Sequence, residues 1–376
     1  MRKILGGCTA LTASQLGSSS GTSSSLAHGI KASREVPGSS AAGRHPFAHR
    51  STWRPVTDEM GPMVDTLHDD ELRVDVRLVR ALVDGALPEY ASLPLSPLGS
   101  SGSSNALFRL GDEFLVRLPR QPGGSAAIEK EARWLPQMGP LLPVSVPEIV
   151  AIGERGLDYP ERWSVVRWID GNVPTVVDPR SEVKAARGSL ALDLAAVVNA
   201  LHAIVGPPSA LADPSLRWYR GAPLAAQDMQ TRRAIEACRD ISDLDLDLDA
   251  ALQVWEQAMT LPGIEQVATP RWYHGDLLAE NLLVRAGRLT AVLDFGGLAV
   301  GDPTVDLIVA WEVLDTASRD VFRQAVGADD PSWFRGRAWA LTLALGTFPY
   351  YWVTMPDRCA SRLAIARSIL AEATST

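Results

Sequence analysis

The sequence predicts an α+β protein of two lobes: a small, mostly antiparallel sheet with one helix, then a mainly helical lobe with a central β-hairpin. Three observations support this fold class. Short segments of alternating apolar and polar residues, separated by Gly-containing turns, occupy much of 93–171. After Gly171 the apolar residues recur at helical spacing instead. Two short apolar runs around a Gly-containing turn interrupt this helical part at 282–293.

Composition places the chain among globular proteins and excludes several functional classes. It has 376 residues, 46% of them hydrophobic, and a formal net charge of −8. An acidic chain lacks the basic footprint of general nucleic-acid binding, so we expect no nucleic-acid partner. No apolar run reaches the roughly 18 residues of a membrane helix, so we expect no membrane partner. Three widely spaced cysteines form no CxxC pattern and favour a reducing, cytoplasmic location.

Residues 1–60 differ from the rest of the chain because stretches such as "SQLGSSSGTSSSLAHGI" are rich in Ser and Gly and carry no apolar period. Such a segment cannot bury enough surface to offset its ordering entropy, so we predict a disordered extension. An over-extended start is the alternative, since Met60 and Met63 stand just before the first segment with a folding pattern.

The first lobe is expected over residues 65–170. Apolar residues at helical spacing, led by acidic residues, predict a helix within 69–90. The stretch "LPLSPLGSSGSSNALFRLGDEFLVRLPR" (93–120) predicts three strands joined by two turns. A helix is expected over 124–138, and two further strands in "VPEIVAIGE" and "RWSVVRWIDG".

The second lobe is expected over residues 171–376. Helical periodicity predicts helices over 182–204, 229–240, 249–259, 304–314, 331–353 and 361–373. The aspartate run "RDISDLDLDLDAA" (239–251) is interpreted as a solvated loop with Asp249 as helix cap, with a cation-holding role as the alternative.

The hairpin at 282–293 carries polar residues at both ends. Asn281 precedes its first strand and Asp294 follows its second, and a hairpin brings its outer ends together. A carboxylate and an amide oxygen suit Mg²⁺, which prefers oxygen ligands, rather than zinc. Asp276, five residues before Asn281, would stand beside the ion, where its carboxylate could accept or orient a hydroxyl proton.

These motifs resemble a known family. "HGD" (274–276), the Asn five residues later and the "DFG" (294–296) thirteen residues after that Asn are similar to the catalytic and metal loops of the aminoglycoside phosphotransferases. These enzymes are relatives of the protein kinases. "VGDPTVDLIVAW" (300–311) also resembles the segment that follows in that family. The resemblance implies a protein-kinase-like two-lobed fold, with ATP and Mg²⁺ between the lobes and Asp276 as the catalytic residue.

The resemblance also assigns nucleotide-binding residues in the first lobe. "GSSGSSNALFRL" (99–110) is similar to the family's phosphate-covering loop, which implies contacts to the nucleotide from Ser101, Ser103, Ser104 and Asn105. Arg117 stands where kinases carry a strand lysine, and Glu131 is its implied partner, with Glu129 as the alternative. "WSVVRWIDG" (163–171) resembles the hinge, where backbone groups near Arg167 and Ile169 would hold adenine.

Three further polar residues are interpreted as support for the site. His274 is expected to brace the catalytic loop, with direct proton transfer as the alternative. Asp302 stands before Pro303, the pattern of a helix N-cap with Pro in the first turn. Asp306 is expected to support the loop rather than to bind a ligand. His202 is interpreted as a core or half-exposed residue.

The predicted function is ATP-dependent transfer of the γ-phosphate to a hydroxyl of a small molecule. The resemblance implies an aminoglycoside or related antibiotic, or a metabolite such as a choline-, homoserine- or sugar-like alcohol. A nucleotide-binding pseudokinase with a regulatory role is the second hypothesis, based on Arg117 and the glycine-poor loop. A hydrolase using His274 and Asp276 is the third, but after residue 60 the chain has no G-x-S-x-G nucleophile elbow.

Overall fold

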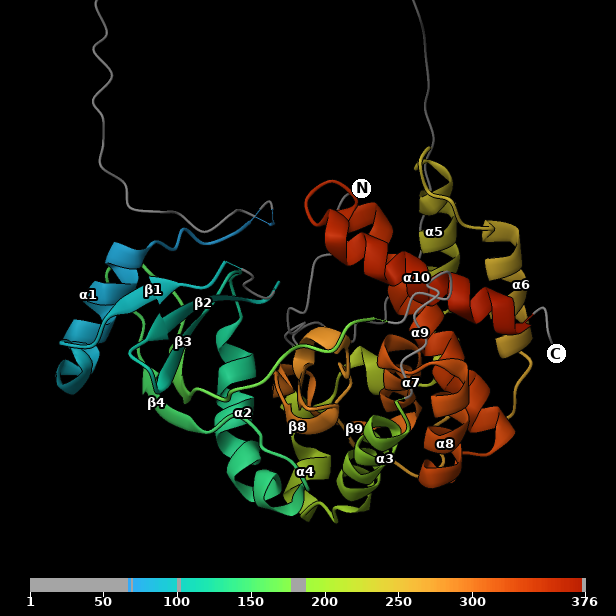
Figure 1. Ribbon diagram of the computed structural model, residues 1–376, viewed down its shortest axis with the longest axis horizontal. Coiled ribbons are helices and arrows are strands. Elements are labelled where there is room, and N and C mark those ends of the chain that lie inside the picture. Colours follow the sequence, from blue (N-terminus) through green and yellow to red (C-terminus); the bar gives the residue numbers. More distant parts are fainter. Residues whose placement is uncertain (1–66, 69, 100–102, 177–186, 374–376) are drawn as a thin grey trace, which may run out of the picture. The chain divides into compact units, whose positions relative to one another are not determined.

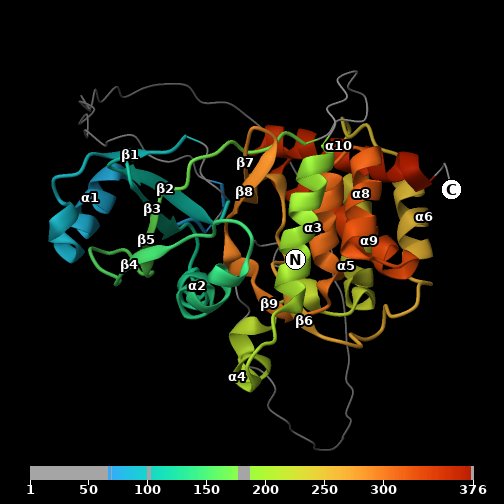
Figure 2. The same ribbon diagram turned by 60° about the horizontal axis from the view of Figure 1, so that its bottom comes forward.

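The structure, a computed structural model, describes residues 67–68, 70–99, 103–176 and 187–373, which fall within one compact unit. The predicted extension over 1–60 lies outside the described residues. Two separate hydrophobic cores define two lobes. Figures 1 and 2 show the strands of the first lobe beside α1, and the helices α8, α9 and α10 gathered in the second. In the described ranges, no helix is long and apolar enough to cross a membrane.

The first lobe is built on a five-stranded antiparallel sheet in the order β1-β2-β3-β5-β4. Its strands are β1 (Leu95–Pro97), β2 (Asn105–Leu110), β3 (Phe114–Pro119), β4 (Ile149–Gly153) and β5 (Trp163–Arg167). β2 alternates half-buried and buried residues, so one of its faces packs into the core. All five predicted strands are present.

Two helices are associated with this sheet: one packs against the core of the first lobe, and the other reaches from the sheet into the core of the second lobe. α1 (Val76–Ala86) begins at the N-cap Asp75 and packs against the sheet core. α2 (Ser125–Met138) starts beside Glu161, whose carboxylate accepts from the backbone N–H groups of Gly123 and Ser125 at 2.8 and 2.9 Å. The last turns of α2 place Trp134 in the core of the second lobe, so this helix belongs to both lobes.

The second lobe is mainly helical, as predicted. Its helices are α3 (Gly188–Ala203), α4 (Pro208–Ala212), α5 (Asp228–Arg239), α6 (Leu248–Ala258), α7 (Val309–Val313), α8 (Thr316–Val326), α9 (Asp330–Tyr351) and α10 (Pro356–Ala373). Short 3-10 turns occur along the whole described chain. They are η1 (Pro88–Tyr90), η2 (Gly139–Leu141), η3 (Pro214–Leu216), η4 (Tyr219–Gly221), η5 (Leu224–Gln227), η6 (Ala279–Asn281), η7 (Phe295–Gly297) and η8 (Pro303–Ile308).

Two small antiparallel sheets carry the central motifs. β7 (Leu282–Arg285) pairs with β8 (Arg288–Val292), which confirms the predicted hairpin. Ala286 and Gly287 at its tip both have positive φ, 50° and 74°, as a two-residue turn requires. β6 (Arg271–Tyr273) pairs with β9 (Ala299–Gly301), so the chain segments on both sides of the hairpin are joined as well.

Two local predictions differ from the structure, and a third is tested only in part. The cap of α6 is Asp247, whose side chain accepts from the N–H of Ala250, and not Asp249, which lies inside the helix and pairs with Arg239 at 2.6 Å. The helix predicted from Thr304 begins as the 3-10 turn η8 before it becomes α7. The helix predicted from Glu182 is described only from Gly188, because 177–186 lie outside the described residues.

The contact between Gly153 and Trp163 gives a test of the sheet packing. A Cβ at Gly153 would lie 1.9 Å from the Trp163 ring, which is fully buried. We expect Gly153→Ala to lower the free energy of unfolding by about 1 to 3 kcal/mol through overpacking. The control is Gly156→Ala, where a Cβ would meet no atom within 4 Å. Urea unfolding of the two variants measures the difference, and equal stability would contradict this packing.

Candidate active site

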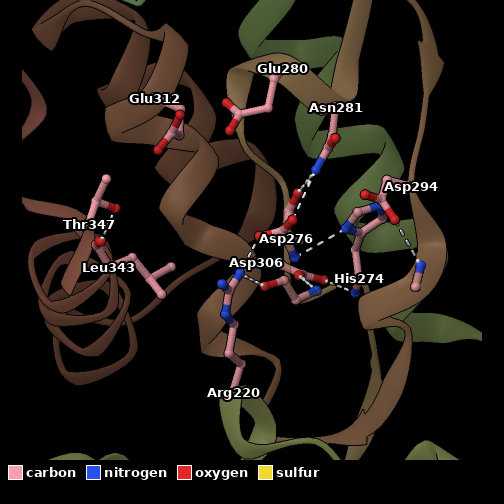
Figure 3. A network of polar contacts seen from close by, with 12 residues as sticks. Arg220, His274, Asp276, Glu280, Asn281, Asp294, Asp306, Glu312, Leu343 and Thr347 are labelled. Carbon is pink, nitrogen blue, oxygen red and sulfur yellow. Dashed lines mark hydrogen bonds and ion pairs between the residues drawn. The ribbon is translucent and has the colours of Figure 1, made fainter. Parts of the chain in front are cut away.

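The loop that begins at His274 is fixed through the imidazole of that residue, which is fully buried. Nδ1 lies 3.1 Å from the backbone N of Asp276, so it accepts that N–H, and Nε2 lies 3.0 Å from the carbonyl oxygen of Leu293, so it donates. This pattern requires the neutral tautomer protonated on Nε2. Both ring nitrogens therefore have backbone partners, and the ring ties the loop to the end of β8. Figure 3 shows the bond between His274 and Asp276.

Asp306 holds the same loop from below. Its fully buried carboxylate accepts from the N–H groups of His274 at 2.9 Å and Gly275 at 2.7 Å. His202 of α3 lies 3.2 Å from the same carboxylate. Gly275 has a φ of +78°, and a Cβ there would lie 2.6 Å from Trp218, so this position requires glycine. Asp306 thus sets the backbone direction immediately before Asp276.

The Asp276 carboxylate is held at both oxygens. Oδ1 accepts from Arg220, and Oδ2 accepts from Nδ2 of Asn281 at 3.1 Å. The same Asn281 nitrogen donates to the Asp276 carbonyl at 2.8 Å. Burial alone would raise the pKa of Asp276, but the charge of Arg220 and its hydrogen bond outweigh burial and hold that pKa below its ordinary value. Asp276 is therefore an ionised, oriented carboxylate.

Arg220 is a site residue that the sequence interpretation missed. It lies on the turn η4, 56 residues before Asp276, and its guanidinium is almost fully buried. The sequence offered one signal, the clustered "WYRG" at 218–221 in an otherwise apolar and small-residue stretch. Nothing local to that motif indicates which acidic group the arginine meets.

Asp294 follows the hairpin in the left-handed region, with φ 55° and ψ 72°. This conformation is uncommon for a residue with a side chain. Its Oδ1 accepts from the N–H of Gly296 at 3.3 Å. Burial, followed by the negative charges of Glu131 and Asp276, raises the pKa of Asp294. A cation beside Asp294 would relieve this repulsion.

Asn281 and Asp294 lie at the two ends of the hairpin, as expected. The N–H of Leu293 donates to the carbonyl of Asn281 at 2.8 Å, which extends the pairing of β7 and β8 by one step. Because Nδ2 of Asn281 is used on Asp276, the amide oxygen is the atom left to bind another group.

Arg117 of β3 connects the first lobe to this site. Its guanidinium bonds to Glu131 of α2, and its Nε donates to Oγ of Ser164 at 3.1 Å. Burial lowers the pKa of Arg117, but the negative charges of Glu131 and then Asp294 outweigh burial, so its pKa is raised above the ordinary value. Glu129, the alternative partner, instead pairs with Arg162 near the surface. Among the described residues, the second oxygen of Glu131 is buried without a hydrogen-bond partner.

The remaining nucleotide-binding candidates lie on the first lobe and its exit strand. Ser103 and Ser104 precede β2, and Asn105 is its first residue; Ser101 lies outside the described residues. The backbone carbonyl of Ser103 lies 2.7 Å from Nε2 of His68. At the predicted hinge, the N–H of Arg167 already donates to the sheet, at 3.0 Å from the Glu148 carbonyl.

The hinge side chains do not converge on the site. Arg167 is exposed and pairs with Glu148 at 2.9 Å. The N–H of Trp168 donates to the carbonyl of Glu113 at 2.7 Å. Among the described residues, Ile169 makes neither an ion pair nor a backbone hydrogen bond. Its backbone groups are therefore the ones at the hinge that can still bind a ligand.

Glu280, an exposed residue of the turn before the hairpin, joins a cluster with the last helix. Its carboxylate pairs with Arg358 at 2.6 Å and with Arg362 at 3.0 Å. Arg362 also bonds to Glu312 of α7, which accepts the N–H of Ala279 at 3.1 Å. Burial lowers the pKa of Arg362, but Glu312 and Glu280 outweigh burial and raise it. Helix α10 is thus tied to the loop that carries Asn281.

Asp302 and the turn after the hairpin complete the support. Asp302 is the N-cap of η8, with Pro303 in the first turn, and accepts the N–H of Thr304 at 3.0 Å. Its own N–H donates to the carbonyl of Gly221 at 2.9 Å. The segment after the hairpin is therefore fastened to the turn that carries Arg220.

A small antiparallel sheet whose strand arginine pairs with a helix glutamate, above a helical lobe with an "HGD" loop and a "DFG" turn, defines a protein-kinase-like architecture. The chain belongs to the phosphotransferase enzyme family, whose model matches residues 96–339. This confirms the family, and the enzyme class, that the motifs predicted.

Known relatives agree with this assignment. The chain is similar to an aminoglycoside 3'-phosphotransferase of Escherichia coli, with 32% identity over 125 residues. That match covers 32% of this chain and 42% of the relative, so it spans less than half of that protein's length.

Solved structures show the same fold. The GDP complex of an aminoglycoside 2'-phosphotransferase-IIIa aligns with a TM-score of 0.61 and 21% identity, covering 80% of this chain and 100% of that one. A macrolide 2'-phosphotransferase, MphH from Brachybacterium faecium, aligns with a TM-score of 0.51 and 23% identity, covering 78% and 97%. The predicted protein-kinase-like fold is confirmed.

The cluster around Arg362 yields a prediction. Arg362→Met would leave Glu312 buried without its cation and remove two bonds to Glu280. Breaking a buried ion pair from one side costs about 3 to 5 kcal/mol, so we expect a loss of that size in urea unfolding. Arg358→Met is the matched control on the same helix. Arg358 is more exposed, and we expect a loss of at most about 1 kcal/mol. Equal losses would refute the bracing role.

Proposed function

We propose that this protein transfers the γ-phosphate of ATP to a hydroxyl group of a small molecule. The observation that carries the proposal is the Asp276–Asn281 pair, joined by hydrogen bonds of 2.8 and 3.1 Å, with Asp294 at the other end of the hairpin from Asn281. Membership of the phosphotransferase enzyme family supports it. In this arrangement a group that orients a hydroxyl stands beside two oxygen donors for a metal.

The nucleotide is assigned to the space between Arg117 and Asp294. Arg117 is a buried cation held by Glu131 and Ser164, which suits it to contact phosphate oxygens. Ser103, Ser104 and Asn105 would cover the phosphates from β2, and the backbone near Ile169 would hold adenine. Three related structures contain GDP, ADP and, with streptomycin, ATP.

The site fits Mg²⁺. The described residues hold no group of three or more His, Cys, Asp and Glu suited to a metal, which disfavours zinc. They do hold the Asp294 carboxylate, the Asn281 amide oxygen and a buried Glu131 oxygen without a partner, at a place where negative charges repel. Asn281 and Asp294 would hold the ion, with water and phosphate as further ligands. Mg²⁺, when bound, neutralises charge on the phosphates.

The chain's own residues then act by position and charge. The acceptor hydroxyl donates its hydrogen bond to Asp276, which directs the hydroxyl oxygen toward the γ-phosphorus. As the new O–P bond forms, the bond from the γ-phosphorus to the β–γ bridging oxygen breaks, ADP leaves, and the hydroxyl proton passes to Asp276. The lowered pKa of Asp276 makes it a weak base, which suits a loose transition state in which the hydroxyl loses its proton late. His274 braces the loop and does not transfer the proton, because both its nitrogens are occupied.

For the acceptor, aminoglycosides and related antibiotics are the first class to test. Related structures contain kanamycin, gentamicin and streptomycin, and others are macrolide phosphotransferases. Choline-, homoserine- and sugar-like alcohols form the second class. ATP consumption should be measured against a panel of both, with and without Mg²⁺. Tight ATP binding without turnover on any acceptor would favour a pseudokinase instead.

Asp276→Ala tests the catalytic assignment. The variant loses the group that orients the acceptor, so turnover should fall by about 10²- to 10⁴-fold while ATP affinity changes little. Initial rates of ADP release and a fluorescent-nucleotide titration measure the two quantities. The control is Asp193→Asn, a carboxylate that pairs with Arg288 at 2.7 Å on the hairpin's far end and should leave turnover unchanged. Turnover like that of the wild type in Asp276→Ala would exclude the proposed mechanism.

Asp294→Asn tests the metal assignment. Removing the charged ligand should weaken Mg²⁺-dependent nucleotide binding by about 10- to 100-fold, the range seen when metal sites lose even indirect support. Binding measured calorimetrically without Mg²⁺ should be unchanged or tighter, since a repelling charge is removed. An equal Mg²⁺ dependence in Asp294→Asn and the wild type would exclude Asp294 as a ligand.

A further inference from the structure

Resting on the proposed function, we propose that Arg220 is a positioning residue that fixes the Asp276 carboxylate for the acceptor hydroxyl. The supporting observation is one nitrogen that meets both the side chain and the backbone of the loop. Nη1 of Arg220 donates to Oδ1 of Asp276 and to the carbonyl of Gly275, the latter at 2.9 Å. Figure 3 shows Arg220 approaching Asp276 from below, while Asn281 approaches from above.

These contacts leave the carboxylate little freedom. Arg220 occupies Oδ1 and Asn281 occupies Oδ2 at 3.1 Å, so rotation of the carboxylate would break a bond on either side. The two partners come from different elements, η4 and η6. The lone pairs that remain on the two oxygens therefore have one orientation, and an acceptor hydroxyl must meet them there. Misplacement of a reacting group by about 1 Å can cost about 100-fold in rate.

Arg220 is itself held in place by its neighbours. Its Nε donates to the hydroxyl of Tyr219 at 2.9 Å, and its guanidinium lies over the rings of Trp218 and Tyr219, 4.6 and 5.6 Å from their centroids. Stacking on aromatic rings favours a planar guanidinium over an ammonium. The side chain reaches Asp276 in a preset orientation.

The backbone of η4 is fixed as firmly. A Cβ at Gly221 would lie 2.2 Å from the ring of Tyr273, and one at Gly301 would lie 2.3 Å from the carbonyl oxygen of Gly221. The hydroxyl of Tyr273 also lies 3.2 Å from the carbonyl of Trp218. Turn η4 is thus packed against β6 and β9, the strands that flank the catalytic loop and the hairpin. Arg220 and Asp276 share one rigid support.

If Arg220 only stabilised the fold, its replacement would have different kinetic effects from those expected for a positioning residue. Loss of a stabilising contact lowers the amount of folded enzyme, but the molecules that remain folded keep nearly the same kcat and KM. Loss of a positioning contact lowers kcat, leaves KM for ATP nearly unchanged, and has no further effect once Asp276 itself is gone.

The test uses the full chain and four variants: Arg220→Met, Arg220→Lys, Tyr219→Phe and the pair Arg220→Met with Asp276→Ala. Rates are measured with ATP, Mg²⁺ and the panel acceptor that the wild type phosphorylates fastest. We expect Arg220→Met to lower kcat about 100-fold with KM for ATP within about threefold. Arg220→Lys should recover part of this loss, and millimolar methylguanidine should restore part of the rate of Arg220→Met. The double variant should be no slower than Asp276→Ala.

Controls separate the possible failures. Arg232→Met removes a half-buried arginine that pairs with Asp228 and Glu256 on α5 and α6, away from Asp276, and it should retain the wild-type rate. If Arg220→Met fails to fold, Tyr219→Phe still tests the proposal, because loss of the hydroxyl that holds Nε should lower kcat severalfold. A wild type that phosphorylates no acceptor overturns the proposed function and this inference together. An active wild type with an unchanged kcat in Arg220→Met and Tyr219→Phe, or with independent effects in the double variant, overturns this inference alone.

Discussion

The site depends first on one buried carboxylate, that of Asp306. It accepts the N–H groups of two consecutive residues, His274 and Gly275, at 2.9 and 2.7 Å. Two N–H groups in a fully buried loop must find acceptors or cost free energy, and a carboxylate satisfies both at once. The direction of the chain into Asp276 follows from this contact, because Gly275 can then adopt its positive φ. The imidazole of His274 donates to the carbonyl of Leu293, so the end of the hairpin is fixed relative to the same loop.

The charged side chains around the loop that carries Asp276 fall into two groups with different charge balance. On the side that the proposed function assigns to the acceptor, Asp276 has Arg220, and Glu280 and Glu312 share Arg358 and Arg362. On the nucleotide side, Asp294 and Glu131 share Arg117, and one Glu131 oxygen has no partner. The second group is therefore short of positive charge among the described residues, where the proposed function places Mg²⁺. Asp276 lies at the boundary between the two groups.

The parts of the fold that were predicted correctly are those specified by local sequence. The hairpin follows from two apolar runs around Ala286–Gly287, and the five strands follow from alternation between turns. Contacts across long separations were not accessible: Arg220 meets Asp276 over 56 residues, and Arg362 meets Glu280 over 82. The cap of α6 was misplaced because any aspartate of "DLDLD" can cap, and a tertiary ion pair to Arg239 takes Asp249. Candidate residues were found by motif, and their partners required the structure.

The ion pair between Arg362 and Glu280 also orders events during synthesis. Ribosomes add roughly 5 to 20 residues per second, so the 82 residues between these partners correspond to a delay of roughly 4 to 16 s. In that interval the loop with Asp276 and Asn281 has been translated, while helix α10 has not. Glu312 lies 50 residues before Arg362, so the delay before this second ion pair can form is roughly 2.5 to 10 s. A nascent chain of this protein therefore acquires its finished loop late, after nearly all of the helical lobe has left the ribosome.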